Sequence, residues 1–219
     1  MSIIQGVIGS IQGGGGSYRF AQPGEGSFGN SYGVSISSQG TPYDPGNGSL
    51  YNPPNSCNLG ALKRRAYKGL WNNGSSASDD NPSIFNGTAL ETVFDDYVAF
   101  DVNTGTDNYC FEWLGYYKAT STDTWNFACT ADDTCMIWLG SSAINPNNNN
   151  WLCNSHYYSG INNNSVSLIA DTYYPIRIRF QEWGGGEIVN VWSGVAGTDP
   201  TTMSYRRSQI AYNPNSNGF

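Results

Sequence analysis

The sequence has a single histidine, His156, and no CxxC motif among its 219 residues. One imidazole excludes a multi-histidine zinc site and leaves no complete Ser–His–acid set for nucleophilic catalysis. His156 lies in the polar stretch 151–165 and is interpreted as a surface residue. The five cysteines are odd in number and have no paired spacing, which makes a poor disulfide framework. Cys129 and Cys135 could still cross-link the loop between them; the alternative is two small apolar residues on adjoining strands.

Charge is also scarce, and most of it is negative. Charged residues make up 12% of the chain, and 10 Lys and Arg stand against 17 Asp and Glu, for a net charge of −7. Because binding phosphates needs a basic surface, this balance argues against a nucleic-acid partner. No apolar run approaches the roughly 20 residues that span a bilayer, so no membrane insertion is expected. The short apolar stretch 3–8 has no basic residue before it and is not a secretory signal. The chain is then either made and used without export or a mature form whose signal has been removed, and the intact Met1 favours the first.

Aromatic residues and glycine are abundant instead, with 14% aromatics and 27 glycines. Short stretches of alternating apolar and polar residues recur, separated by polar turns, and no window has the period of an amphipathic helix. The strands expected from this alternation are 97–102, 111–113, 125–129, 166–170, 173–180 and 187–192. Within 173–180, Ile176, Ile178 and Phe180 are expected to face inward. Arg177 and Arg179 alternate with them and are expected to face outward. The pattern predicts an all-β fold, an antiparallel β-sandwich.

Two adjacent carboxylates, Asp132 and Asp133, stand directly before the apolar run that ends at Gly140. Neighbouring carboxylates repel each other, and neither can be buried as a bare charge at a tolerable cost. The pair therefore either lies in open water or binds a cation. Hard divalent cations such as calcium collect carboxylate and carbonyl oxygens. The pair alone leaves both alternatives open.

The first 66 residues differ from the rest of the chain. They are rich in glycine and in turn signals, such as Gly13–Gly16 and Thr41–Gly48, and have little periodicity. Such a segment becomes ordered only when another surface holds it. We therefore expect residues 1–66 to be an extended N-terminal arm that docks on other subunits of a larger assembly. Residues 67–195 are predicted to form the sandwich, and residues 196–219 a C-terminal extension.

Five motifs along residues 67–195 occur in the order seen in a known family. They are Tyr67–Leu70, Phe111–Ala119, Trp125–Cys129 followed by Asp132–Asp133, Ile137–Ala143, and Tyr173–Ile178 with the turn Trp183–Gly186 after it. Together they resemble the protective-antigen-type (PA-fourteen) β-sandwich of bacterial toxins, some glycosidases and fungal adhesins. The segment Ile137–Ala143 is especially similar to the GLEYA adhesin branch, in which Trp-aliphatic-Gly-x-x-Ala follows an Asp pair.

The resemblance implies a calcium site. In the adhesin members the two Asp side chains hold the ion, the peptide bond between them is cis, and sugar hydroxyls complete the oxygen shell. Carried onto this chain, the pair Asp132–Asp133 supplies the expected metal ligands, and Gln181–Glu187 is the loop that selects the sugar. The adhesins usually have Asn where this chain has Glu182. That carboxylate could be a further calcium ligand, or it could instead form an ion pair with Arg177 or Arg179.

Aromatic and polar side chains supply the expected sugar contacts. Trp183 stands out because it lies in a turn, between Glu182 and three glycines, where a side chain is seldom buried. The predicted sugar-binding residues are Gln181, Glu182, Trp183, Gly184 and Trp138. Trp151, Tyr157 and Tyr158 could also stack on sugar rings, although most aromatic residues of this chain are expected to form the core.

Three functions compete: a calcium-dependent carbohydrate-binding module, a structural subunit of a particle, and a glycan-cleaving enzyme; the first two are compatible. We expect a virion structural protein, oligomeric in a tail, baseplate or capsid decoration, whose adhesin-like domain binds host surface glycans in a calcium-dependent manner. The alternatives are a purely architectural sandwich without sugar binding, and a secreted, extracellular adhesin. A glycosidase needs two carboxylates that face each other across a cleft. Asp95, Asp96, Glu112 and Glu182 are available, but nothing in the sequence marks two of them as facing each other, and Glu112 is expected at a solvent-facing position of a strand. No enzyme is therefore predicted.

Overall fold

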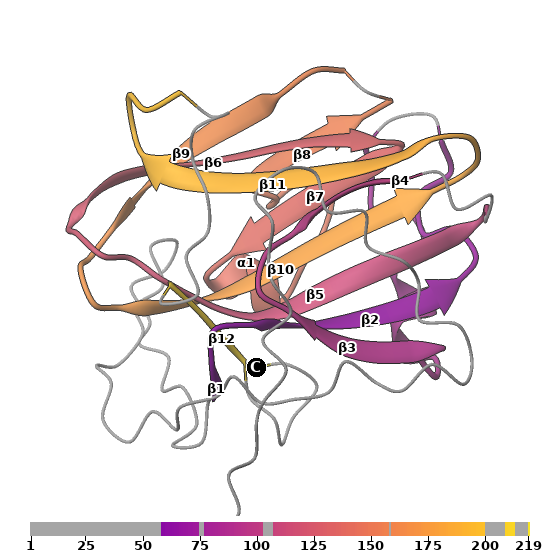
Figure 1. The fold of residues 1–219 in the computed structure, drawn as a ribbon, viewed down its shortest axis with the longest axis horizontal. Helices are drawn as coiled ribbons and strands as arrows, with labels where there is room; N and C mark the ends of the chain where they lie inside the picture. The colour runs from indigo at the N-terminus through magenta and orange to yellow at the C-terminus, as the bar shows by residue number, and fades with distance from the viewer. Residues whose placement is uncertain (1–57, 75–76, 103–106, 158, 200–208, 213–218) are drawn as a thin grey trace, which may run out of the picture.

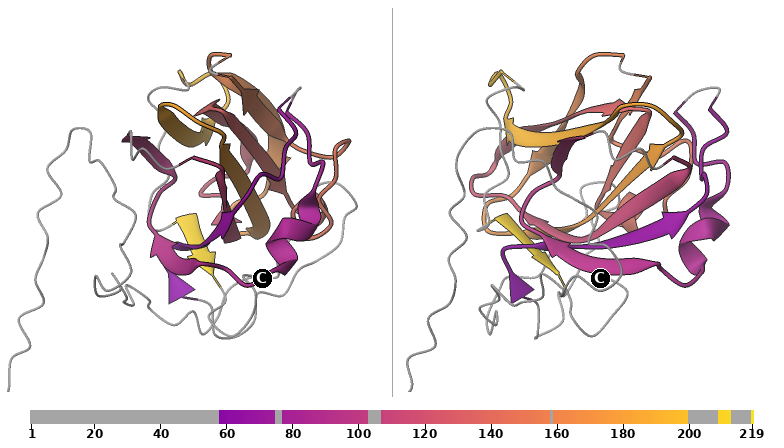
Figure 2. Two further views of the ribbon diagram at one scale, coloured as in Figure 1. Left: turned by 90° about the vertical axis from the view of Figure 1, so that its right-hand side faces the viewer. Right: turned by 45° about the vertical axis from the view of Figure 1, so that its right-hand side comes forward.

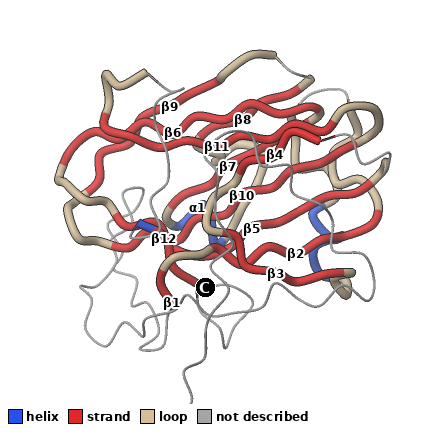
Figure 3. Tube along the Cα trace, in the orientation of Figure 1, coloured by secondary structure: helices blue, strands red, loops and turns tan. Residues whose placement is uncertain are grey.

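The computed structural model describes residues 58–74, 77–102, 107–157, 159–199, 209–212 and 219, and its regular structure is almost entirely β (Figures 1 and 3). The strands are β1 (Asn58–Leu59), β2 (Leu62–Lys68), β3 (Glu91–Asp95), β4 (Ala99–Val102), β5 (Tyr109–Lys118), β6 (Asp123–Asp132), β7 (Thr134–Leu139), β8 (Cys153–His156), β9 (Asn162–Leu168), β10 (Tyr173–Glu182), β11 (Glu187–Val195) and β12 (Ile210–Tyr212). The two short helices are the 3-10 helix η1 (Pro82–Asn86) and α1 (Ser141–Ile144). Within these ranges no helix has the length and apolar character needed to cross a membrane.

The strands form two antiparallel sheets packed face to face (Figures 1 and 2). The first sheet has the order β1–β12–β5–β10–β7–β8, and β2 and β3 join it through β5. The second sheet has the order β4–β11–β6–β9. The predicted all-β antiparallel sandwich is therefore confirmed. The expected strands within 109–195 are all present, most of them several residues longer than their alternating stretches.

Strand β5 has two partners along one edge. Along this edge, β2 pairs with the first half of β5, and β12 pairs with Tyr116 and Tyr117. Along the opposite edge, β10 pairs with the whole length of β5. The two partners meet at Gly115, where an added Cβ atom would lie 2.3 Å from the carbonyl oxygen of Ala211 and 2.8 Å from Leu62. Only glycine fits such an approach, which explains its place in the Phe111–Ala119 motif.

The sandwich extends beyond the predicted range 67–195. Strands β1 and β2 precede it, and β12 follows it. The basic residues 63–65 were expected in the arm but alternate across β2, with Arg64 placed 2.8 Å from Asp95 and over the ring of Phe111. A run of basic residues shows no alternation of apolar and polar residues, so this strand could not be predicted from the sequence. Of the predicted arm, residues 1–57 lie outside the described residues.

Apolar side chains fill the space between the sheets. Ile176, Ile178 and Phe180 of β10 lie fully buried there, as predicted. Cys129 and Cys153 lie in the same core with their Sγ atoms 3.4 Å apart, and the cysteines of the described part of the chain are free and buried. This supports small apolar core residues over a Cys129–Cys135 cross-link.

A second apolar cluster covers the outer face of the first sheet. Trp71 and Phe85, from the segment that contains η1, pack on Met136 and Trp138 of β7. Both faces of this sheet are therefore partly covered. Arg179 faces outward as predicted but is only 3% exposed, because this segment lies over it.

Candidate calcium and sugar site

The two aspartates lie where the chain crosses from one sheet to the other. Asp132 is the last residue of β6 and pairs with Ile188 of the second sheet, whereas Thr134 opens β7 and pairs with Gln181 of the first. The peptide bond between Asp132 and Asp133 is cis, as the resemblance implied. Asp133 is 5% exposed, and Asp132 is partly exposed.

Asp133 connects two neighbouring loops. Its carboxylate accepts a hydrogen bond from the backbone N–H of Trp183, in the turn between β10 and β11. Its carbonyl oxygen accepts a hydrogen bond of 2.6 Å from the backbone N–H of Tyr157, directly after β8. Its own N–H donates to the carbonyl oxygen of Gln181. The aspartate pair is therefore fixed to the turn that the sequence singled out.

Trp183 presents its indole ring at the surface of this end of the sandwich. The residue is 41% exposed, as its place in the turn predicted. Its ring packs against Gly74, where an added Cβ atom would lie 1.7 Å from the ring. Tyr157, 48% exposed, approaches the same glycine and donates a hydrogen bond of 2.9 Å from its hydroxyl to the Gly74 carbonyl. Two exposed aromatic residues thus flank one short loop.

Glu182 is the unusual carboxylate of this region. It is fully buried, on the same side of β10 as Phe180, and neither of its carboxylate oxygens has a hydrogen-bond partner. A buried carboxylate without a partner is costly as an anion. Burial, followed by the negative charges of Asp133, Glu187, Asp132 and Asp107 in that order, raises the pKa of Glu182 to about 8.

Three further acids lie near Glu182. Burial and then the charge of Asp133 raise the pKa of Asp132. Glu187, at the start of β11, is 1% exposed. Gly184 lies close to Asp107, whose Cγ atom would be 3.5 Å from an added Cβ. One end of the sandwich therefore gathers carboxylate oxygens that repel one another.

This donor set fits a hard divalent cation. A calcium ion prefers oxygen ligands, and its charge would favour the ionised form of each acid. Among the described residues, no three acidic, histidine or cysteine side chains are grouped so that they could hold a metal ion by themselves. An ion at the aspartate pair would therefore need further oxygens from backbone, water or a ligand, and such an open site can accept sugar hydroxyls.

Two predicted sugar-binding residues do not reach the surface. Trp138 is fully buried beneath the segment that contains η1, and its Nε1–H donates to the carbonyl oxygen of Asn147. This prediction was wrong. Alternation along β7 places Trp138 on the outer face of the first sheet, and nothing in the sequence indicated that another segment covers this face. Gln181 is also fully buried, and its amide bonds the backbone N–H and carbonyl of Asn72 at 2.7 and 3.2 Å. Gln181 therefore positions the loop that carries Gly74 and cannot itself touch a sugar.

The alternative ion pair of Glu182 with Arg177 or Arg179 is also wrong. Both arginines lie on the opposite side of β10 and bind Glu112. Glu112 was expected at a solvent-facing position, yet it is fully buried among three arginines. The sequence did not reveal this, because the covering segment comes from a distant part of the chain.

Sequence reasoning missed the loop 72–74 and Asp107. The Asn-Asn-Gly sequence at 72–74 is an ordinary turn signal and gave no indication of its position. Asp107 precedes β5 and is brought to the site only by the pairing of Tyr109 with Glu182. Of the extra aromatic candidates, Trp151 is 38% exposed and Tyr158 lies outside the described residues.

Comparisons with known proteins agree with this architecture. Residues 109–192 match the GLEYA domain family. The fold is similar to the A domain of Epithelial Adhesin 9 from Candida glabrata, solved in complex with Galβ1-4GlcNAc, with a TM-score of 0.57 and 15% identity over 78% of this chain and 95% of that chain. It is also similar to the Epithelial Adhesin 6 A domain of the same organism, in complex with Galβ1-3GlcNAc (TM-score 0.53, 17% identity, 85% and 94% covered).

A third similar structure is the PA14 domain of the antifreeze protein MpAFP, with a TM-score of 0.52 and 15% identity over 73% of this chain and 94% of that chain. Among curated protein sequences, none matches the chain. At these identities the solved structures show a shared fold. The chain is thus an antiparallel β-sandwich whose fold is similar to that of these adhesin and PA14 domains, and its residues 109–192 match the GLEYA domain.

Proposed function

We propose that this sandwich binds a carbohydrate through a calcium ion held at Asp132, Asp133 and Glu182. The observation that carries the proposal is the buried Glu182 carboxylate, which has no hydrogen-bond partner and stands among other acids beside the aspartate pair. A bound cation would relieve the cost of that arrangement. The GLEYA match and the sugar-bound adhesins of the same fold support carbohydrate as the ligand.

The residues have distinct roles in this proposal. Calcium, when bound, offers coordination positions to a pair of sugar hydroxyls. Asp133 is held in place by the backbone N–H groups of Trp183 and Tyr157, so it needs little rearrangement on binding. Trp183 offers an apolar ring surface to the sugar face, and Gly184 leaves room for close approach. Gln181 positions the Gly74 loop on which Trp183 rests.

The test is a calorimetric titration of Galβ1-4GlcNAc, the ligand of a similar adhesin, into metal-stripped protein with and without calcium. Sugar binding should require calcium. Asp133→Asn should abolish calcium binding, whereas Asp171→Asn should not, since Asp171 is an exposed residue paired with Lys118. Equal sugar binding in EDTA would overturn the proposal. Calcium binding without this sugar would call for a wider glycan screen.

We further propose that the domain belongs to a virion subunit, docked through the Gly-rich residues ahead of β1. The composition of residues 1–57 supports docking on a partner, and an architectural sandwich or a secreted adhesin is the alternative. Removal of residues 1–57 should leave calcium and sugar binding unchanged and abolish incorporation into particles. If particles still incorporate the shortened chain, the docking role is wrong. We propose no catalysis, because Glu112 is engaged by three arginines.

A further inference from the structure

A basic pocket lies on the outer face of the first sheet, apart from the aspartate pair. Arg65 of β2, Glu112 of β5 and Arg179 of β10 form one row across three adjacent strands. In the neighbouring row, Arg177 stands opposite Leu114. Because alternate residues of a strand share a face, all of these side chains lie on the same side of the sheet. Glu182 lies on the other side.

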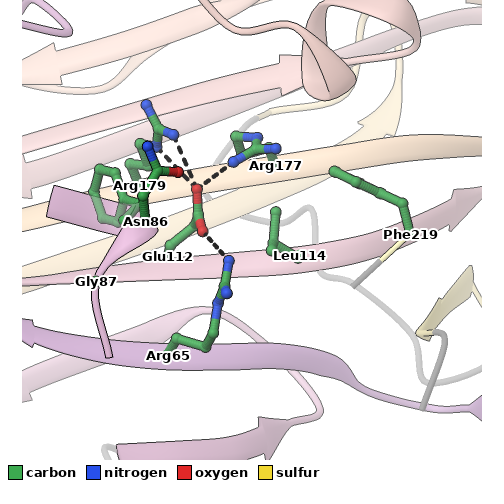
Figure 4. A pocket seen from close by; sticks show the side chains of 9 residues that line it. Arg65, Asn86, Gly87, Glu112, Leu114, Arg177, Arg179 and Phe219 are labelled. Atoms are coloured by element: carbon green, nitrogen blue, oxygen red, sulfur yellow. Dashed lines mark hydrogen bonds and ion pairs between the residues drawn. The ribbon is translucent and has the colours of Figure 1, made fainter. Parts of the chain in front are cut away.

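Three guanidinium groups converge on one carboxylate (Figure 4). Arg65 lies 2.6 Å from Glu112, Arg179 lies 3.0 Å from it, and Arg177 also bonds it. Arg179 bonds Asp79 as well, at 2.6 Å. Three positive charges thus meet two negative ones, in a chain whose net charge is −7.

The cluster has unused donors. Arg65 uses its Nη2 for Glu112, which leaves its Nη1 to donate elsewhere. Arg177 donates from Nε to the carbonyl oxygen of Ala143 and from Nη1 to Glu112. An arginine carries five N–H groups, so each of these two side chains can donate further. The positive charge of Arg65 also adds to burial in lowering the pKa of the neighbouring Lys63.

These donors line a cavity. Arg65, Arg177 and Arg179 line a cavity of about 570 Å³, together with the apolar side chains of Phe85, Leu114 and Phe219 (Figure 4). Arg65 and Arg177 are 15% and 13% exposed, so their charges are reachable from solvent yet poorly hydrated. A planar guanidinium in such a place binds an oxyanion by two parallel hydrogen bonds.

We propose that this pocket binds an oxyanion group, a carboxylate or a sulfate, between Arg65 and Arg177. The added negative charge would balance the cluster and accept hydrogen bonds from the Nη N–H groups of Arg65 and Arg177 that Glu112 leaves unused. The apolar wall and the volume leave room for the remainder of a small ligand beyond the anion itself. The pocket does not involve the calcium site, so it operates in metal-free protein.

The test is calorimetry in EDTA, at an ionic strength kept constant with chloride, of sodium sulfate, glucuronate and uncharged glucose. Sulfate and glucuronate should bind saturably, and glucose should not. Tighter binding of glucuronate than of sulfate identifies a carboxylate carried by an organic ligand, and the reverse order identifies an inorganic anion. Arg65→Gln should weaken both by about tenfold or more. Lys68→Gln, which removes a charge from the exposed end of the same strand, should change neither.

A second measurement does not depend on the fold of a variant. Bound sulfate should protect Arg65 and Arg177 of the wild-type protein from modification by phenylglyoxal, while Arg64, on the other face of β2, keeps its rate. No saturable binding at constant ionic strength, equal binding of glucose, or equal protection of all three arginines would each overturn the proposal.

Discussion

Gly74 lies beneath the indole ring of Trp183 and has a φ of +80°. A side chain at this position would meet two obstacles, the strain of the left-handed backbone and the ring itself. The loop can therefore support the ring only because residue 74 has no side chain. Here a residue without a side chain determines where an exposed aromatic ring lies.

Gly74→Ala should displace Trp183 and weaken sugar binding by about tenfold or more, equivalent to about 1.4 kcal/mol. Calcium affinity should change little, because no ligand is altered. Calorimetry with each ligand measures both effects.

Gly197→Ala is the control, because Gly197 has a φ of +90° with no atom within 4 Å of the added Cβ. It should cost similar backbone strain, about 1–2 kcal/mol, and leave sugar affinity intact. Equal sugar affinity in both variants would mean that Trp183 does not contact the sugar.

Trp138 and Trp183 were both predicted to contact sugar, but Trp138 is fully buried and Trp183 is partly exposed. Trp138→Ala should lower the free energy of unfolding by about 3–5 kcal/mol, because it removes a fully buried ring. Trp183→Ala should cost about 1 kcal/mol or less and lose sugar affinity. Urea unfolding measures the first difference, and calorimetry the second. A large loss of stability in Trp183→Ala would instead make that ring structural.

At the scale of elements, Glu112 holds three neighbouring strands together through one carboxylate. It binds Arg65 of β2 and both Arg177 and Arg179 of β10 while lying on β5 between them. Burial raises the pKa of Glu112, but the three arginine charges outweigh burial and lower it below the ordinary value of 4.5. The ionised form is therefore the native one.

Glu112→Gln should lower the free energy of unfolding near pH 7 by about 3–5 kcal/mol, because the arginines lose their buried counter-charge. The folded pKa is lowered, so the wild-type contribution is complete above pH 4.5 and is lost as pH falls through the folded value. Urea unfolding from pH 7 down to 3 should show the two proteins converge below pH 4.5. A difference that stays constant across this range would exclude the ion pairs as its cause.

Glu91→Gln provides a matched control on the neighbouring strand. Glu91 lies 3.9 Å from Arg64, and its side chain is 19% exposed. Such a loose pair is worth about 1 kcal/mol or less. A loss as large as that of Glu112→Gln would show that the effect is not specific to the three-arginine cluster.

At the scale of the whole molecule, calcium should stabilise the folded chain if it binds there alone. At 100 times its dissociation constant, a ligand adds about 2.7 kcal/mol. For a domain of this size that raises the melting temperature by about 5–10 °C. Calorimetric melting in calcium and in EDTA measures the shift, and Asp133→Asn should show none. A shift that persists in this variant would place the ion elsewhere.

The sequence allowed the fold to be predicted because its information is local and repeated. Alternation in 173–180 identified β10 and its buried face, and the order of motifs identified the sandwich. The errors share a cause, which is contact between distant segments. Trp138, Gln181 and Glu112 lie on a face covered by residues 71–74 and 77–86, and no local sequence pattern indicates that this face is covered. At the site, the aspartate pair and Trp183 were visible in the sequence, but their proximity to Gly74 and Asp107 was not.

The pairing of β5 with both β2 and β12 along one edge also determines where the chain enters and leaves the sandwich. Strands β1 and β12 pair beside Tyr116, near the start of β10, whereas Glu182 and the Trp183 turn stand at the opposite end of β10 (Figure 1). Seven residues of extended strand separate Pro175, the partner of Tyr116, from Glu182, roughly 20 Å or more. The chain therefore enters and leaves the sandwich at one pole and offers its carboxylates and aromatic rings at the other. A domain with this polarity can be tethered by both of its flanking segments and still present the end with the aspartate pair outward, away from whatever holds it.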